Sequence, residues 1–263
     1  MLQYSFMKNA FLAASLVSLL CPLIGTFVVL KKYSMLGDTL SHSSFAGIAL
    51  GIVFGFNPIL SAFIFTAFAG IIIELLRNKY EKYEELIMVI VLTLGVGIGI
   101  TLVSSGKVST NIDSYLFGSI LTVSKNDLYT ILALSIISII TIFFLYHKLI
   151  YITFDEEGAR ISGLNVKLIN YIFMVLVSAT VSVSLRIMGM LVISSMIAVP
   201  VAASLQLNKS FKYTLIFSII FGFIDTITGL ILSLYLNAAP GGLIALVSVF
   251  VLILVILIKS FRK

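Results

Sequence analysis

Long apolar runs, each about twenty residues, follow one another along almost the whole chain. Hydrophobic residues make up 60% of the 263 residues and charged residues only 11%, whereas a soluble domain carries about 25% charged residues. A helix needs about 20 apolar residues to cross the hydrocarbon core of a bilayer. The sequence therefore predicts an all-α integral membrane protein, a polytopic helical bundle that forms one transmembrane domain over residues 1–263.

We expect eight or nine transmembrane helices. They are predicted near residues 10–30, 36–56, 58–76, 86–105, 127–146, 168–187, 189–207, 213–236 and 241–258. Most of the 17 Lys and Arg residues fall in alternate loops between these spans. The positive-inside rule then places the N-terminus outside and the C-terminus in the cytoplasm. Because this asymmetry accounts for the net charge of +6, the charge gives no reason to expect nucleic-acid binding.

Two ionisable residues, Asp38 and His42, lie at the start of the second predicted span. A spacing of four places both side chains on one face of a helix. A carboxylate and an imidazole are two donors of a transition-metal site, and ionisable groups inside a membrane are commonly functional. The alternative is that Asp38 supplies a charge at the helix N-terminus and His42 is a satisfied interior residue.

A stripe of small residues, Gly47, Gly51 and Gly55, continues along the same span. Small residues spaced by four allow two membrane helices to approach closely. The stripe falls on the other side of the helix from Asp38 and His42. We therefore expect one face of this helix to pack tightly and the opposite face to present the ionisable pair.

A third ionisable residue, Asp225, lies near the middle of the predicted span 213–236. A carboxylate at this depth is costly unless it is paired or lies in a wet cavity. One interpretation is a metal ligand or gate residue that lines a polar pathway. The other is an Asp hydrogen-bonded to Ser or Thr of a neighbouring helix.

The predicted cytoplasmic segment 151–170 contains a short stretch with helix-capping residues. Asp155 is placed to cap a helix whose first turn carries Glu156 and Glu157, and Gly163 is placed to end it. A short capped helix between two membrane spans suits the docking of a cytoplasmic partner. The alternative is an ordinary solvated loop.

Several motifs together resemble the permease subunits of zinc/manganese-type ABC importers. The first is the segment 36–42, Leu-Gly-Asp-Thr-Leu-Ser-His, followed by Ala46 and Gly47. Segments 111–119, 155–163, 188–203 and 239–242 resemble further parts of that family, in the same order and at similar spacing. The resemblance covers essentially the whole chain.

The resemblance implies a homodimer in the cell membrane with a central pathway lined by Asp38 and His42. It also implies two cytoplasmic ABC ATPase subunits, an extracytoplasmic metal-binding protein, and surrounding membrane lipid as partners. It implies that the ATPase contacts Asp155, Glu156, Glu157, Ala159, Arg160 and Gly163. Many members carry Asp just before the late Pro-Gly turn, where this chain has Asn237. Asn237 can ligate only through a neutral oxygen, so a metal site there would be weaker or would depend on Asp225.

The expected cargo is a divalent transition-metal ion, Zn²⁺ in preference to Mn²⁺ or Fe²⁺, with no permanently bound cofactor. The chain contains no Gly-x-x-x-x-Gly-Lys-[Ser/Thr] loop, so it is expected to be no enzyme and to rely on a separate ATPase. The alternatives are an ABC permease for a metal chelate and an ion-coupled secondary transporter with Asp38, His42 and Asp225 as a relay. An intramembrane metalloprotease is a further alternative, against which the missing His-Glu-x-x-His motif and the total of two histidines argue.

Overall fold

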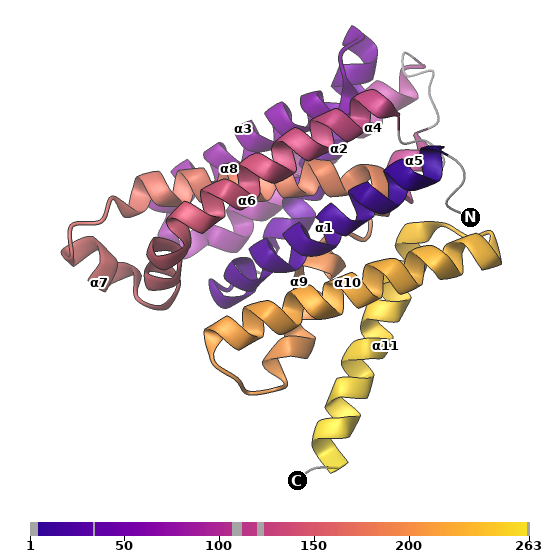
Figure 1. The fold of residues 1–263 in the computed structure, drawn as a ribbon. Coiled ribbons are helices and arrows are strands. Elements are labelled where there is room, and N and C mark those ends of the chain that lie inside the picture. The colour runs from indigo at the N-terminus through magenta and orange to yellow at the C-terminus, as the bar shows by residue number, and fades with distance from the viewer. Residues whose placement is uncertain (1–4, 34, 107–111, 120–123, 262–263) are drawn as a thin grey trace.

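The computed structural model describes residues 5–33, 35–106, 112–119 and 124–261, and every regular element within them is a helix. Figure 1 shows the arrangement of these helices. The first six elements are α1 (Ser5–Leu30), α2 (Leu36–Phe54), α3 (Pro58–Lys79), the 3-10 helix η1 (Glu81–Tyr83), α4 (Glu84–Ser104) and α5 (Asp113–Leu116). The remaining six are α6 (Lys125–Phe154), α7 (Glu156–Ile161), α8 (Val166–Met188), α9 (Ile193–Leu205), α10 (Phe211–Leu236) and α11 (Pro240–Phe261).

Seven helical segments of the described residues are long and apolar enough to cross a membrane. They are α1 from Met7, α3, the segment formed by η1 and α4, α6, α8, α10 and α11. The predicted spans 36–56 and 189–207 correspond to α2 and α9. The first turns of α2 carry polar and ionisable side chains, and α9 has only 13 residues. The all-helical, multi-pass architecture is confirmed, whereas the expected count of eight or nine spans is not.

The helices form a bundle whose two ends carry different short elements. The short helix α7 lies at one end, and α5 lies at the opposite end near the N-terminus (Figure 1). We call these the α7 end and the α5 end. Helices α1 and α8 are central. In the most apolar 18-residue stretch of each helix, the buried share is 67% for α1 and 78% for α8, whereas it is 17% for α11. The last helix, α11, diverges from the bundle (Figure 1).

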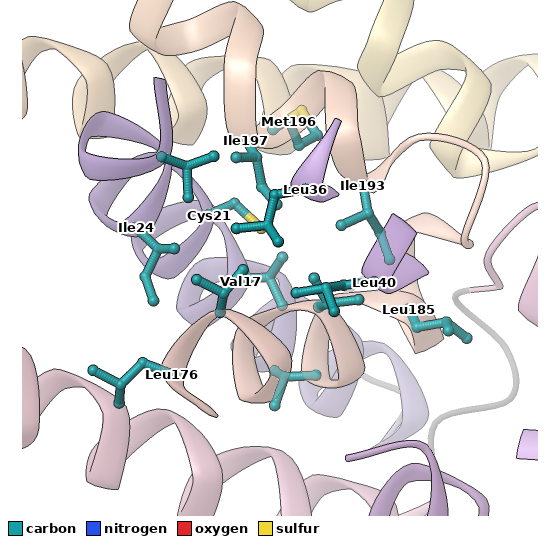
Figure 2. Close-up of a cluster of buried hydrophobic side chains, with 14 of the residues drawn as sticks. Val17, Cys21, Ile24, Leu36, Leu40, Leu176, Leu185, Ile193, Met196 and Ile197 are labelled. Atoms are coloured by element: carbon teal, nitrogen blue, oxygen red, sulfur yellow. The ribbon is translucent and has the colours of Figure 1, made fainter. Parts of the chain in front are cut away.

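A cluster of apolar side chains joins α1, α2, α8 and α9 (Figure 2). Leu36 and Leu40 of α2 are fully buried in this cluster. Figure 2 shows them among Val17, Cys21, Ile24, Leu176, Leu185, Ile193, Met196 and Ile197. Burying a Leu side chain contributes about 1.5–3 kcal/mol in water, and in lipid the same close packing acts through dispersion contacts. The two leucines therefore fix which face of α2 points into the bundle.

Two of the three glycines in the predicted stripe bring α2 against α3. A Cβ atom at Gly47 would lie 2.8 Å from Cα of Ala62, and one at Gly51 would lie 2.7 Å from Oγ of Ser61. Gly55 differs from the expectation. It ends α2 in a left-handed conformation with φ of 72°, and a Cβ atom there would meet nothing within 4 Å. Gly55 therefore acts as a helix C-cap and not as a packing residue, because α2 ends at Phe54.

A substitution at Gly47 tests the close approach of α2 and α3. We expect Gly47→Val to destabilise the folded protein by about 1–3 kcal/mol, because the added side chain forces the helices apart. The matched control is Gly97→Val in α4, since a Cβ atom at Gly97 would meet nothing within 4 Å. The measurement is the thermal unfolding midpoint of each purified variant in detergent. Equal midpoints for the two variants would contradict the packing role of Gly47.

Candidate functional site

The orientation of α2 turns Asp38 and His42 away from the leucine cluster. At about 100° per residue, both positions fall on the face opposite Leu36 and Leu40. Asp38 lies in the first turn of the helix, and no side chain of the preceding residue Met35 caps the helix N-terminus. The buried contacts that hold the start of α2 therefore also determine which way the two ionisable side chains point.

The surroundings of the two residues leave donor atoms available. Asp38 is exposed, and His42 is half-buried. Nδ1 of His42 is buried and has no hydrogen-bond partner among the described residues. In contrast, the hydroxyl groups of Ser41 and Ser43 donate to carbonyl oxygens one turn earlier in the same helix, at 2.7 and 2.9 Å. An imidazole nitrogen without a protein partner is suited to metal ligation, and the carboxylate one turn away provides a second donor.

Helix α4 supports α2 on the flank beside His42. A Cβ atom at Gly95 of α4 would lie 3.0 Å from Cα of Ser43 and 3.2 Å from the carbonyl carbon of His42. The hydroxyl group of Thr39 also donates to the carbonyl oxygen of Met88 at 3.3 Å. With α3 packed along its later turns, α2 is held by backbone contacts on two sides. Such support fixes the position of donor atoms better than a loop would.

Asp225 lies in a different part of the bundle from Asp38 and His42. It is fully buried in α10, and the Ser248 side chain of α11 lies beside its carboxyl group. Helix α10 packs against α1, α9 and α11, whereas α2 packs against α3, α4, α8 and α9. Within the described residues, no group of three or more His, Cys, Asp or Glu side chains is arranged to hold a metal ion. One chain thus does not gather the expected ligands into one site.

Asn237, the fourth residue considered as a metal ligand, ends α10. It is exposed and adopts a left-handed conformation with φ of 50°, which Asn tolerates better than most residues. Asn237 lines a cavity of about 320 Å³ at the α5 end, together with Ser119, Ser233 and Pro240. The structure therefore shows a helix-capping role for Asn237. This residue ends α10, whereas Asp225 lies within the helix.

The segment around α7 has the capped helix that its sequence predicts. Oδ1 of Asp155 accepts a hydrogen bond from the Gly158 backbone N–H at 2.8 Å, which caps the N-terminus of α7. Gly163 follows the helix with φ of 84°, and its N–H donates to the carbonyl oxygen of Arg160 at 3.1 Å. This conformation is far more accessible to glycine than to other residues. The chain therefore makes a defined turn before α8 begins.

The surface of α7 combines apolar and charged side chains. Ala159 is fully buried and anchors the helix, whereas Ile161 is 88% exposed and the preceding Phe154 is 64% exposed. Arg160 pairs with Glu156 one turn away, with Nη2 and Oε1 3.6 Å apart. Exposed apolar groups beside exposed charges are typical of a surface that meets another protein.

The α5 end contains an ion pair that the pattern of predicted transmembrane spans does not reveal. Nη2 of Arg186, at the end of α8, lies 3.3 Å from Oδ2 of Asp127 at the start of α6. The guanidinium carbon lies 4.7 Å from the centre of the Tyr115 ring in α5. The backbone N–H of Met190 also donates to the carbonyl oxygen of Tyr115 at 2.9 Å. These contacts fasten α5 over the connection between α8 and α9. The capping-box pattern of Ser124 and Asp127 is the one local signal in the sequence.

Comparisons with known proteins agree over the whole length of the chain. The profile of the ABC 3 transport family matches residues 3–259. A "Probable metal transport system membrane protein" of Treponema pallidum is 50% identical, with 97% of this chain and 96% of that protein aligned. The membrane protein ZnuB of a high-affinity zinc uptake system in Buchnera aphidicola is 34% identical, with 95% and 96% aligned. Other relatives, named for manganese and iron transport, are 29% identical.

The fold also matches a solved structure. PsaBC from Streptococcus pneumoniae, solved in complex with a Fab, superposes with a TM-score of 0.86. The match covers 96% of this chain and 91% of that chain at 26% identity. The arrangement of helices described above is therefore shared with that protein.

A substitution at Asp127 tests how α5 is fastened. We expect Asp127→Asn to accelerate hydrogen–deuterium exchange in residues 112–119, because the variant removes the charge that pairs with the nearly buried Arg186. The loss of one partner of a buried ion pair costs about 3–5 kcal/mol. Asn126→Ala is the control, since Asn126 is exposed in the same first turn of α6 and lies outside the segment measured. The same exchange rate in Asp127→Asn as in the unaltered protein would show that the ion pair does not hold α5.

Proposed function

Because the chain belongs to the ABC 3 transport family, we propose that it is the transmembrane permease subunit of an ATP-driven importer of divalent transition-metal ions. The observation that carries the proposal is the pairing of exposed Asp38 with His42, whose Nδ1 has no partner in the described structure. Ionisable side chains within a membrane protein bundle are expected to face a pathway or another protein, not lipid.

The proposed site is completed by a second copy of the chain. Asp38 and His42 of one chain supply two donors, whereas tetrahedral zinc needs four. Two copies related by a twofold axis near α2 would bring together two carboxylates and two imidazoles. This reasoning supports a homodimer with the ion pathway along its axis. An oxygen and nitrogen ligand set suits Zn²⁺, Mn²⁺ and Fe²⁺, and we favour Zn²⁺ because the set matches its tetrahedral preference.

The proposed orientation of the chain in the membrane rests on the basic residues. The loops at the α7 end carry most of the Lys and Arg residues, so we assign this end to the cytoplasm and the α5 end to the outside. An extracytoplasmic metal-binding protein would deliver the ion at the α5 end. The ATPase, which this chain does not contain, would dock on the α7 segment through Asp155, Glu156, Glu157, Ala159, Arg160 and Gly163.

The chemistry of the pathway is reversible ligation. An incoming ion exchanges water for the Asp38 carboxylate and the His42 imidazole, both of which must be deprotonated to bind it. Acidic conditions therefore oppose transport, because protons compete for the same atoms. Release towards the cytoplasm requires the donors to separate, and ATP-driven movement of the two copies would supply that separation.

Uptake of radioactive Zn²⁺ and Mn²⁺ tests the proposed site. The protein is reconstituted into vesicles with its ATPase and binding protein, as wild type, Asp38→Asn, His42→Gln and Asp225→Asn. We expect the first two substitutions to lower ATP-dependent uptake by at least about tenfold, because Asp38→Asn removes the negative charge of a ligand and His42→Gln removes the imidazole nitrogen. Asp225→Asn should keep most of the uptake, since Asp225 lies between α10 and α11. Full uptake by Asp38→Asn and His42→Gln would refute the site, and uptake without ATP would favour a secondary transporter.

A charge reversal on α7 tests the docking role. We expect Arg160→Glu to lower co-purification of the ATPase and its coupled ATP hydrolysis, because the change breaks the pair with Glu156 and places a third acid on the exposed surface. Lys209→Glu is the matched control, since Lys209 is exposed on a different loop of the α7 end. Wild-type binding of the ATPase to Arg160→Glu, with binding lost in Lys209→Glu, would move the docking surface to the α9–α10 loop.

A further inference from the structure

A buried ion pair lies at the α7 end of α3. Glu74 is fully buried and Arg77 is 8% exposed. Nε of Arg77 lies 3.3 Å from Oε2 of Glu74, and Nδ2 of Asn78 donates to Oε1 of Glu74 at 3.1 Å. Buried charges are costly unless they are paired and hydrogen-bonded. These side chains therefore hold one another in a defined position at the end of the helix.

Arg77 also contacts the connection between α1 and α2. Its Nη1 group donates a hydrogen bond to the hydroxyl group of Tyr33, and its guanidinium carbon lies 4.4 Å from the centre of the Tyr33 ring. Tyr33 is only 4% exposed and lies just before α2 begins at Leu36. Arg77 thus links α3 to the short segment that leads into the first turn of α2, where Asp38 lies.

A second contact holds the same connection to α8. Nζ of Lys31 donates to Oδ1 of Asn170 at 2.7 Å and lies 5.3 Å from the centre of the Phe173 ring. Burial lowers the pKa of Lys31 to about 8, and the negative charge of Glu156 on α7 opposes this effect. The hydrogen bond to Asn170 and the contact with Phe173 therefore hold the connection between α1 and α2 against α8.

A polar cleft brings Arg77 and α7 together. The cleft has a volume of about 250 Å³. It is lined by Arg77, Asn78, Glu81, Glu84, Glu156, Glu157 and Arg160. Oε1 of Glu84, at the start of α4, lies 3.8 Å from Nη1 of Arg77. A displacement of α7 changes the electrostatic surroundings of Arg77 directly, because both form walls of the same cleft.

A cavity leaves space on another side of Tyr33. It has a volume of about 250 Å³ and lies between α1, the start of α2, and α9. Its lining includes Tyr33, Gly37, Ser194 and Ala198. Protein interiors are close-packed and contain few voids larger than a water molecule. The start of α2 therefore borders free space beside Tyr33, although Gly37 packs closely against Ser194 of α9.

We propose that Arg77 and Tyr33 are positioning residues that transmit movement of the α7 segment to the first turn of α2, and so set the position of Asp38. The inference rests on the proposed function, in which α7 meets the ATPase and Asp38 meets the ion. The physical basis is the polar cleft that Arg77 shares with α7 and the contacts of Arg77 with Tyr33, next to a cavity at the start of α2. A purely structural role would hold the helices together without affecting how ATP hydrolysis is coupled to uptake.

The decisive variant is Tyr33→Phe, which removes the hydroxyl group that accepts from Arg77 and keeps the ring. In the reconstituted complex with ATPase and binding protein, we expect ATP hydrolysis to stay within about twofold while ions transported per ATP fall by about fivefold. Tyr83→Phe is the matched control, because Tyr83 is 58% exposed at the same end. Arg77→Lys should show the same uncoupling. The double variant of Tyr33→Phe and Arg77→Lys should transport as many ions per ATP as the more affected single variant. Each single substitution already removes the link between Arg77 and Tyr33, so combining them adds no further loss.

A second measurement follows the start of α2 itself. In a Cys21→Ala background, which removes the only cysteine, the maleimide labelling rate at Met35→Cys is compared with and without trapped ATP. We expect an ATP-dependent change that Tyr33→Phe abolishes and Tyr83→Phe preserves. Unchanged coupling and unchanged labelling in Tyr33→Phe would overturn the inference, as would an equal loss of ATP hydrolysis and uptake. A complex with unaltered Tyr33 that shows no ATP-dependent metal uptake would instead count against the proposed function.

Discussion

The packing of Leu36 and Leu40 against α1, α8 and α9 determines what α2 presents to its surroundings. With these leucines buried, the helix period turns Asp38 and His42 to the opposite face. The backbone approaches at Gly47 towards α3 and at Gly95 towards α4 then prevent the helix from rotating. Apolar contacts therefore determine where Asp38 and His42 lie. No hydrogen bond to either side chain is needed to orient them.

Buried ion pairs have a complementary role at the two ends of the bundle. Arg186 of α8 and Asp127 of α6 hold α5 at one end. At the other end, Glu74 and Arg77 both belong to α3, and Arg77 reaches from there to Tyr33 before α2 and to Glu84 of α4. The Arg186–Asp127 pair and the contacts of Arg77 outside α3 join elements that apolar packing alone would allow to slide. Because an unpaired buried charge is costly, each pair favours a discrete arrangement of helices over a continuous range. Discrete arrangements are what a transporter that alternates between states requires.

The helical architecture could be predicted from the sequence because lipid demands apolar helices of a set length. The spacing of Asp38 and His42 likewise predicted their common face, since that relation is local. Gly55 was misassigned because the end of α2 could not be located from the stripe alone. The link between Arg77 and Tyr33 and the separation of Asp225 from α2 depend on which helices are neighbours. Residues far apart in the sequence make these contacts, and the periodicity of one chain does not encode them.

The proposed division of donors between two chains is consistent with what a transporter must do with its cargo. A complete tetrahedral site within one rigid chain would bind zinc with about 10–16 kcal/mol of free energy, as structural zinc sites do. Release from such a site would be slow, and conduction requires binding that is weak enough to reverse. Two donors per chain avoid this outcome, because in the proposed dimer the ligand set exists only while the copies of α2 are close together. In that proposal, the first turn of α2 borders a cavity and Arg77 connects Tyr33 to the cleft shared with α7, so a small displacement of this turn would disassemble the ligand set.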